Sequence, residues 1–155
     1  MSGLLSRFSD RTRRVFARHN GKTFMEGSMA AAALIAIADG DASVSEGAEV
    51  GRLMRVMDAL KEHDPDRGLE SYIRYVDLAR KSPEGVAQVR DVVQKAVAED
   101  SEAAALLIVI CHAVSEADGF VRQSELDEIN RLAALIDVDP EDALEMIAPL
   151  TSQNI

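Results

Sequence analysis

The chain has 155 residues, of which 47% are hydrophobic and only 4% aromatic, with no Trp. It is long enough for one well-cored domain and too short for two, and its aliphatic composition predicts an all-α fold. A net charge of -10 repels nucleic-acid phosphates, which argues against DNA or RNA as a partner.

The N-terminal segment differs from the rest of the chain in charge. Residues 1–22 carry six basic residues against one acid, a net +5, whereas residues 23–155 carry a net -15. Apolar residues on one face and arginines on the others predict a basic amphipathic helix that ends at Asn20-Gly21. We therefore divide the chain into this helix, residues 1–22, and a helical domain, residues 23–155. The arginine-rich helix would dock on the acidic body of the chain or, through residues 1–20, make a weak contact with anionic lipid.

Caps and turns predict a compact single-domain bundle of about seven to eight helices. The second helix, residues 23–39, is apolar nearly all round and should lie centrally. It ends at Asp39-Gly40, where Gly can adopt the left-handed cap. The helices that follow are residues 45–62, one opened by "HDPDRG" at 63–68, one beginning at Pro83 after a Ser82 cap, one capped by residues 100–102, residues 124–136, and a short one from Pro140.

Periodicity also predicts which side chains enter the core. The only cysteine, Cys111, ends the apolar run "AAALLIVIC" and should be a small buried hydrophobe. The helices opened near residue 63 and at Pro83 should turn their apolar faces inward. These faces carry Leu69, Tyr72, Ile73 and Val76, and then Val86, Val89, Val93 and Val97.

Several features favour a cytoplasmic location. A single cysteine allows no internal disulfide and suits a reducing compartment. The N-terminus carries charges where a secretory signal needs an apolar segment. The runs "MAAAALIAIA" and "AAALLIVIC" are about half of the ~20 residues needed to cross a bilayer, so they read as core helices.

The most specific feature is an internal repeat at an offset of 79 residues. Each copy is an apolar helix, an Asp-Gly turn and an acid-led amphipathic helix, so the two copies would pack as a pseudo-two-fold four-helix core. The identical pairs are Ala38 and Ala117, Asp39 and Asp118, Gly40 and Gly119, Ser45 and Ser124, Glu46 and Glu125, Glu49 and Glu128, Arg52 and Arg131, and Leu53 and Leu132.

The repeated acids have two explanations. Glu residues at a helix N-terminus gain about 0.3 to 1 kcal/mol from the helix dipole, so capping alone could account for them. Capping does not explain the Asp at the end of each preceding helix, where the dipole opposes it, or the i,i+3 spacing of the Glu pairs. A divalent cation would turn both repulsions into attractions. The candidate ligands are Asp39, Glu46, Glu49, Asp118, Glu125 and Glu128.

Hard oxygen donors of this kind suit Ca²⁺ or Mg²⁺ better than Zn²⁺. An EF-hand is excluded, because its sixth and twelfth loop positions would be Val44 and Val50. The histidines His19, His63 and His112 are far apart and lack zinc-ligand spacing. No phosphate loop, nucleophile motif or HExxH occurs, so the sequence predicts no enzyme and no organic cofactor.

Three segments resemble the tellurite-resistance protein family TerB. They are "NGKTFMEGSMAAAALIAIADGDASVSEGAEV" at 20–50, "IVICHAVSEADGFVRQSELDEI" at 108–129 and "VDPEDAL" at 138–144. The resemblance implies a compact all-α fold and a non-enzymatic role in bacterial tellurite resistance, stress response or phage defence. It implies partners among the other Ter proteins at the inner membrane face, including a membrane-embedded one, and a metal site at the six acids. Arg122 and Gln123 depart from the usual, more acidic loop.

A second hypothesis needs no metal. Similar domains occur fused to co-chaperone modules, so the chain could be a helical protein-interaction domain, a co-chaperone-like adaptor that docks through its basic N-terminal helix. A third hypothesis is a metal-dependent hydrolase. Paired carboxylates could do acid/base chemistry, but nothing in the sequence indicates a desolvating pocket for them.

Overall fold

The computed structural model describes residues 22–38, 65–115 and 122–145, and within these ranges it contains helices and no strand. The predicted all-α fold is confirmed. The helices are α3 (Lys22–Ala38), α5 (Pro65–Lys81), α6 (Pro83–Ala96), α7 (Ser101–Ser115), α8 (Gln123–Leu135) and α9 (Pro140–Glu145).

These six helices match, in order, six of the predicted ones. The other two, in residues 1–22 and 45–62, lie outside the described residues, so the count of seven to eight is not reached in the part that is described. The pseudo-two-fold repeat is not confirmed either. Its first acid-led helix and both of its Asp-Gly turns fall in the ranges 39–64 and 116–121, which the structure does not describe.

The helix starts follow from local capping chemistry. The Ser82 hydroxyl accepts a hydrogen bond from the Gly85 amide at 3.0 Å, with Pro83 in the first turn where its missing N–H costs nothing. At the start of α7, Asp100 Oδ1 accepts from the Ala103 amide at 3.1 Å. Both predicted caps are therefore present.

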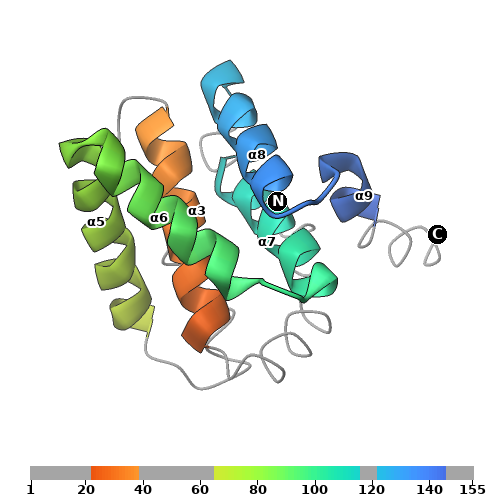
Figure 1. The fold of residues 1–155 in the computed structure, drawn as a ribbon, viewed down its shortest axis with the longest axis horizontal. Helices are drawn as coiled ribbons and strands as arrows, with labels where there is room; N and C mark the ends of the chain where they lie inside the picture. Colours follow the sequence, from red (N-terminus) through yellow and green to blue (C-terminus); the bar gives the residue numbers. More distant parts are fainter. Residues whose placement is uncertain (1–21, 39–64, 116–121, 146–155) are drawn as a thin grey trace.

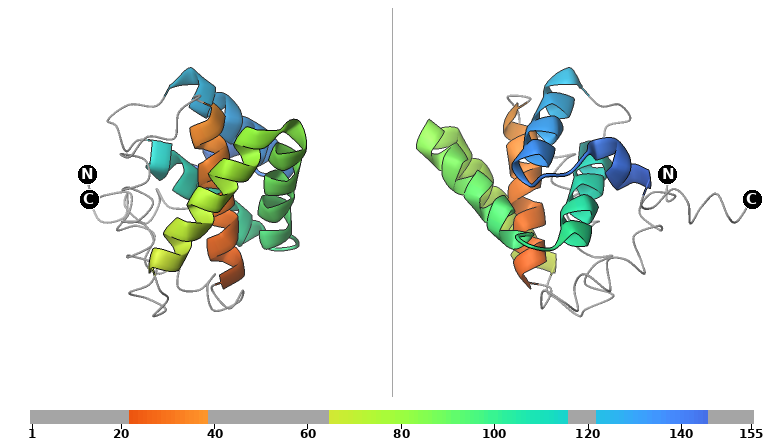
Figure 2. Two further views of the ribbon diagram at one scale, coloured as in Figure 1. Left: turned by 90° about the vertical axis from the view of Figure 1, so that its left-hand side faces the viewer. Right: turned by 45° about the vertical axis from the view of Figure 1, so that its right-hand side comes forward.

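α3 lies at the centre of the described fold, as its apolar sequence predicts. It contacts α5 and α6 on one side and α7 and α8 on the other (Figure 1). Two further views show the same layering, with α9 packed beside α7 and α8 (Figure 2). Burial on both sides explains why a helix with so little polar surface is stable in this place.

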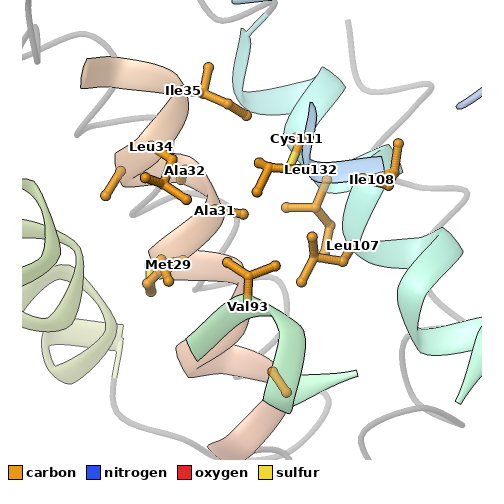
Figure 3. Packing of buried hydrophobic residues seen from close by; sticks show 14 of the residues in the cluster. Met29, Ala31, Ala32, Leu34, Ile35, Val93, Leu107, Ile108, Cys111 and Leu132 are labelled. Atoms are coloured by element: carbon orange, nitrogen blue, oxygen red, sulfur yellow. The ribbon is translucent and has the colours of Figure 1, made fainter. Parts of the chain in front are cut away.

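The core between α3, α7 and α8 consists of aliphatic side chains in close contact. Ala31 and Ile35 lie on the side of α3 that faces Leu107, Cys111 and Leu132 (Figure 3). Cys111 is 1% exposed, which confirms its prediction as a core residue. The largest fully buried side chains are Phe24, Met29, Ile35, Leu107, Ile108, Ile129 and Leu132.

Two glycines allow helices to approach closely. A Cβ on Gly85 would overlap the carbonyl oxygen of Leu78, because α6 turns back against the last turns of α5 after a single linking residue. A Cβ on Gly27 would overlap the Cβ of Ala96, where α3 and α6 cross. Both contacts require the absence of a side chain at these positions.

The predicted inward face of α5 is partly wrong. Ile73 is 52% exposed, whereas Tyr75, not predicted in the core, is 7% exposed. The buried face runs through Tyr72, Tyr75, Val76 and Ala79, the i, i+3, i+4, i+7 spacing of one helix face, which excludes position 73. On α6 the prediction is confirmed, because Val89, Val93 and Val97 are buried and Val86 is half-buried.

Polar contacts with Glu26 explain why a tyrosine lies on the buried face of α5. The Tyr75 hydroxyl donates a hydrogen bond to Glu26 Oε1 on α3, and the Ser71 hydroxyl donates to Glu26 Oε2 at 3.0 Å. Arg74 pairs with the same carboxylate at 3.5 Å. Burial and the hydrogen bond to Glu26 raise the pKa of Tyr75. Glu26 thus joins α5 to α3 through three side chains.

None of the helices in the described ranges is both long enough and apolar enough to span a membrane.

Candidate site at the acidic helix ends

Of the six candidate ligands, the structure describes two. Glu125 and Glu128 lie on α8 and are 2% and 3% exposed. The other four, Asp39, Glu46, Glu49 and Asp118, lie outside the described residues.

Three helices have an end on the same side of the bundle. α3 ends at Ala38 and α7 ends at Ser115 on the side where α8 begins at Gln123 (Figures 1 and 2). Ala38, Ser124 and Glu128 line one pocket of about 280 Å³. The residue directly before Asp39 therefore lies beside the acid-led start of α8.

Glu125 caps its own helix. Its Oε1 accepts a hydrogen bond from the main-chain N–H of Arg122 at 3.0 Å, the acid half of a capping box. Position 122 corresponds to Ser43 in the first copy of the repeat, at the same spacing from Glu46. The capping explanation is therefore correct for Glu125.

Glu128 is the centre of an ion-pair cluster. Arg90 Nη2, from α6, lies 3.3 Å from both carboxylate oxygens, and Arg131 Nη1, one turn along α8, lies 2.8 Å from Oε1. The Glu128 side chain is 4% exposed, whereas the arginine side chains are 38% and 59% exposed. A carboxylate at this depth needs such partners, because burying an unpaired charge is costly.

The described carboxylates do not make a metal site by themselves. Within residues 22–38, 65–115 and 122–145, no three His, Cys, Asp or Glu side chains are grouped so that they could hold a metal ion. Glu128 accepts three hydrogen bonds from arginines, and Asp127 accepts one from Gln123 at 2.9 Å. The donor type, carboxylate oxygen, suits Ca²⁺ or Mg²⁺. A cation here would need ligands from the adjoining turns and would compete with an arginine.

The hydroxyl of Ser115, the last residue of α7, has no hydrogen-bond partner among the residues that the structure describes. Ser115 is 3% exposed. A buried hydroxyl without a partner is uncommon, because it loses its hydrogen bonds to water.

The negative charge of Glu128 also affects the pKa of Cys111 in the core. Burial, with the charge of Glu128 as a second cause, raises the pKa of the Cys111 thiol above its ordinary 9.0. The thiol therefore stays protonated in the folded protein when it would ionise in the unfolded chain. A thiol in this state is a poor nucleophile, so Cys111 has a packing role.

A raised thiol pKa makes stability depend on pH. The contribution is complete below pH 9 and is lost as the pH rises further, because only the unfolded chain releases the proton. We expect Cys111→Ala to remove a slope of up to about 1.4 kcal/mol per pH unit from the free energy of unfolding above pH 9. Urea unfolding of both proteins between pH 7 and pH 10.5 measures it. The Tyr75 hydroxyl, with its raised pKa, titrates in both proteins and cancels. Parallel pH curves would contradict the expectation.

Arg90 and Arg131 were not predicted as partners of Glu128. Arg131 could have been found, because it lies three residues after Glu128 and belongs to the repeated set. Arg90 could not, because it is 38 residues away and no local pattern links it to Glu128.

In the part of the chain that the structure describes, fold and site define a small all-helical protein with two buried carboxylates at the start of α8. The chain matches the family model described as Tellurite resistance protein TerB over residues 25–147, and it belongs to this family. The match runs from within α3 to just past α9 and confirms the resemblance seen in the sequence. Comparisons with curated proteins and with solved structures give no match.

Proposed function

We propose that this TerB-family protein is a non-enzymatic adaptor in tellurite resistance and related stress responses. It works in the cytoplasm, at the inner membrane face, and binds other Ter proteins, including a membrane-embedded one. A divalent cation held at the duplicated acidic turns controls that binding. The family match supports the pathway, and the acids at the helix ends support the cation.

The observation that carries the proposal is the position of two buried carboxylates. Glu125 and Glu128 lie at the start of α8, and Glu128 shares a pocket with Ala38, the last residue of α3. The C-terminal carbonyls of α3 carry the negative end of its dipole on the same side of the bundle. Asp39 and Asp118 follow α3 and α7 in the sequence and would add two more carboxylates there.

A cation titration of the full chain tests the proposal. We expect Ca²⁺, Mg²⁺ or Mn²⁺ to shift the amide signals around both Asp-Gly turns and the start of α8, with smaller effects from Zn²⁺. The double variant Asp39→Asn and Asp118→Asn should lose the response. A matched variant, Asp77→Asn and Asp91→Asn, removes two exposed acids from α5 and α6 and should keep it. Silence at both turns with millimolar cation would exclude the metal.

The metal-free alternative also has an observation in its favour. Arg90 and Arg131 already neutralise Glu128, so this carboxylate needs no cation for stability. In that case the basic residues 1–22 would dock the protein on a partner or on anionic lipid. Sedimentation with anionic liposomes, before and after deletion of residues 1–20, tests whether this segment binds lipid. Lipid binding that deletion does not change, or that is absent before deletion, would exclude the membrane contact.

A further inference from the structure

The pocket beside Glu128 has an apolar part and a charged part. It lies between α6 and α8, which both contact α3, and its volume is about 280 Å³. The apolar lining residues, from α3 and α6, are Leu34, Ile37, Ala38 and Val86. The polar and charged ones are Arg90, Ser124, Asp127, Glu128 and Arg131. Ligand sites commonly combine an apolar lining with a few polar groups, and the small volume suits a short ligand group.

The two arginines outnumber the carboxylate that they share. Arg90 and Arg131 both pair with Glu128, so two positive charges and one negative charge leave a net +1. In the contacts that the structure describes, each guanidinium uses one nitrogen, although it carries five N–H donors. The arginine side chains are 38% and 59% exposed, so a ligand can reach them. Asp127, whose Oδ1 accepts a hydrogen bond from Gln123, is the other acid of the pocket.

The ligand that matches this lining carries a carboxylate beside an aliphatic group. Guanidinium groups pair with carboxylates through parallel N–H donors, and the apolar side chains would be covered by the aliphatic group. The last residue of a protein chain carries both groups on the same carbon atom. It therefore places both in a small pocket while only one length of chain leaves, whereas an acidic residue inside a chain brings two. Capture of a C-terminal carboxylate is a known mode of peptide recognition.

We infer that this pocket binds the C-terminal residue of a partner protein. The terminal carboxylate lies on the guanidinium groups of Arg90 and Arg131. The aliphatic side chain packs against Leu34, Ile37 and Val86. This inference rests on the proposed adaptor role and adds the chemistry of the partner segment, and it requires no cation.

Two synthetic peptides test the inference on the full chain. Both have the sequence acetyl-Gly-Ser-Gly-Ala-Leu, one with a free C-terminal carboxylate and the other with a C-terminal amide. Binding is measured from amide shifts in α6 and α8, without divalent cations and at constant ionic strength. We expect the acid peptide to bind about tenfold more tightly than the amide peptide, which corresponds to about 1.4 kcal/mol. Replacing its last leucine with glycine should weaken it by about the same factor, because the apolar contact is lost.

Variants of the protein identify the groups that hold the carboxylate. Arg131→Gln should reduce the advantage of the acid peptide to about threefold or less and leave the amide peptide unchanged, and Arg131→Lys should restore part of it. Asp127→Asn removes a negative charge from the pocket and should tighten the acid peptide about twofold, whereas a cation would bind this variant more weakly. Lys95→Gln is the control, because Lys95 lies on α6, is 77% exposed and pairs with Asp91. Thermal unfolding checks that each variant is folded.

The outcomes separate this inference from the proposed function. Equal binding of the acid and amide peptides, or no binding of either at millimolar concentration, would overturn the chain-end pocket. Acetate binding as tightly as the acid peptide would indicate a simple anion site, and an amidated peptide with an internal Glu doing so would indicate an acidic segment; both results also overturn it. If the peptides fail and the cation titration succeeds, the proposed function stands. If the cation is silent and the acid peptide binds through Arg131, the cation is excluded and the pocket stands.

Discussion

Replacing Gly85 with alanine is expected to lower the free energy of unfolding by about 2 to 3 kcal/mol. The new Cβ would overlap the carbonyl oxygen of Leu78 in α5, and a main-chain oxygen cannot rotate away as a side chain can. Because Ser82 alone links the two helices, α6 can move only if α5 moves with it. Urea or thermal unfolding measures the loss, which corresponds to a decrease in Tm of roughly 4 to 12 °C.

Helix propensity predicts the opposite sign for this substitution. Alanine is favoured over glycine inside a helix by about 1 kcal/mol, so an open site would gain stability. The matched control is Ala87→Gly, two residues along the same helix at an exposed position, which should lose about that amount. If Gly85→Ala is neutral or stabilising, α5 and α6 do not meet as closely as described.

The starts of α6, α7 and α8 were predictable because capping is local. Ser82 with Pro83 and Asp100 with Ala103 lie within three residues of their partners, and the sequence shows both members of each pair. The same holds for Glu125, which accepts from the main chain of Arg122. Where both partners lie within one helical turn of each other in the sequence, the sequence pattern alone is enough to predict the interaction.

Sequence patterns fail where contacts between distant segments determine which side chains are buried. Periodicity marks Ile73 and Val76 as apolar but cannot say where the buried stripe of α5 is centred. Glu26, 49 residues before Tyr75, accepts the tyrosine hydroxyl and makes its burial favourable, so the stripe includes Tyr75 and leaves Ile73 in water.

The same limit applies to the candidate site. The i,i+3 acids suggested repulsion between carboxylates, whereas Glu128 is held by an arginine from α6 that no spacing rule could assign. Glu125 accepts a hydrogen bond from its own main chain at position 122, and Glu128 pairs with two arginines. The need for an external cation therefore depends on Asp39, Glu46, Glu49 and Asp118, which stay predictions.

Replacing both Arg90 and Arg131 with methionine is expected to cost about 3 kcal/mol or more, because Glu128 would be left buried without a positive partner. Either arginine alone should cost about 1 kcal/mol or less, since the other still compensates the carboxylate and both are partly exposed. The double variant should therefore lose more than the sum of the single variants, which urea unfolding of all three measures.

Adding Glu128→Gln to the double methionine variant identifies the cause of this loss. Glutamine has nearly the shape of glutamate without its charge, so the triple variant should recover most of the stability if the unpaired charge is responsible. A triple variant as unstable as the double one would instead assign the loss to packing of the arginine side chains around the pocket. In that case Glu128 would not depend on the two arginines for its burial.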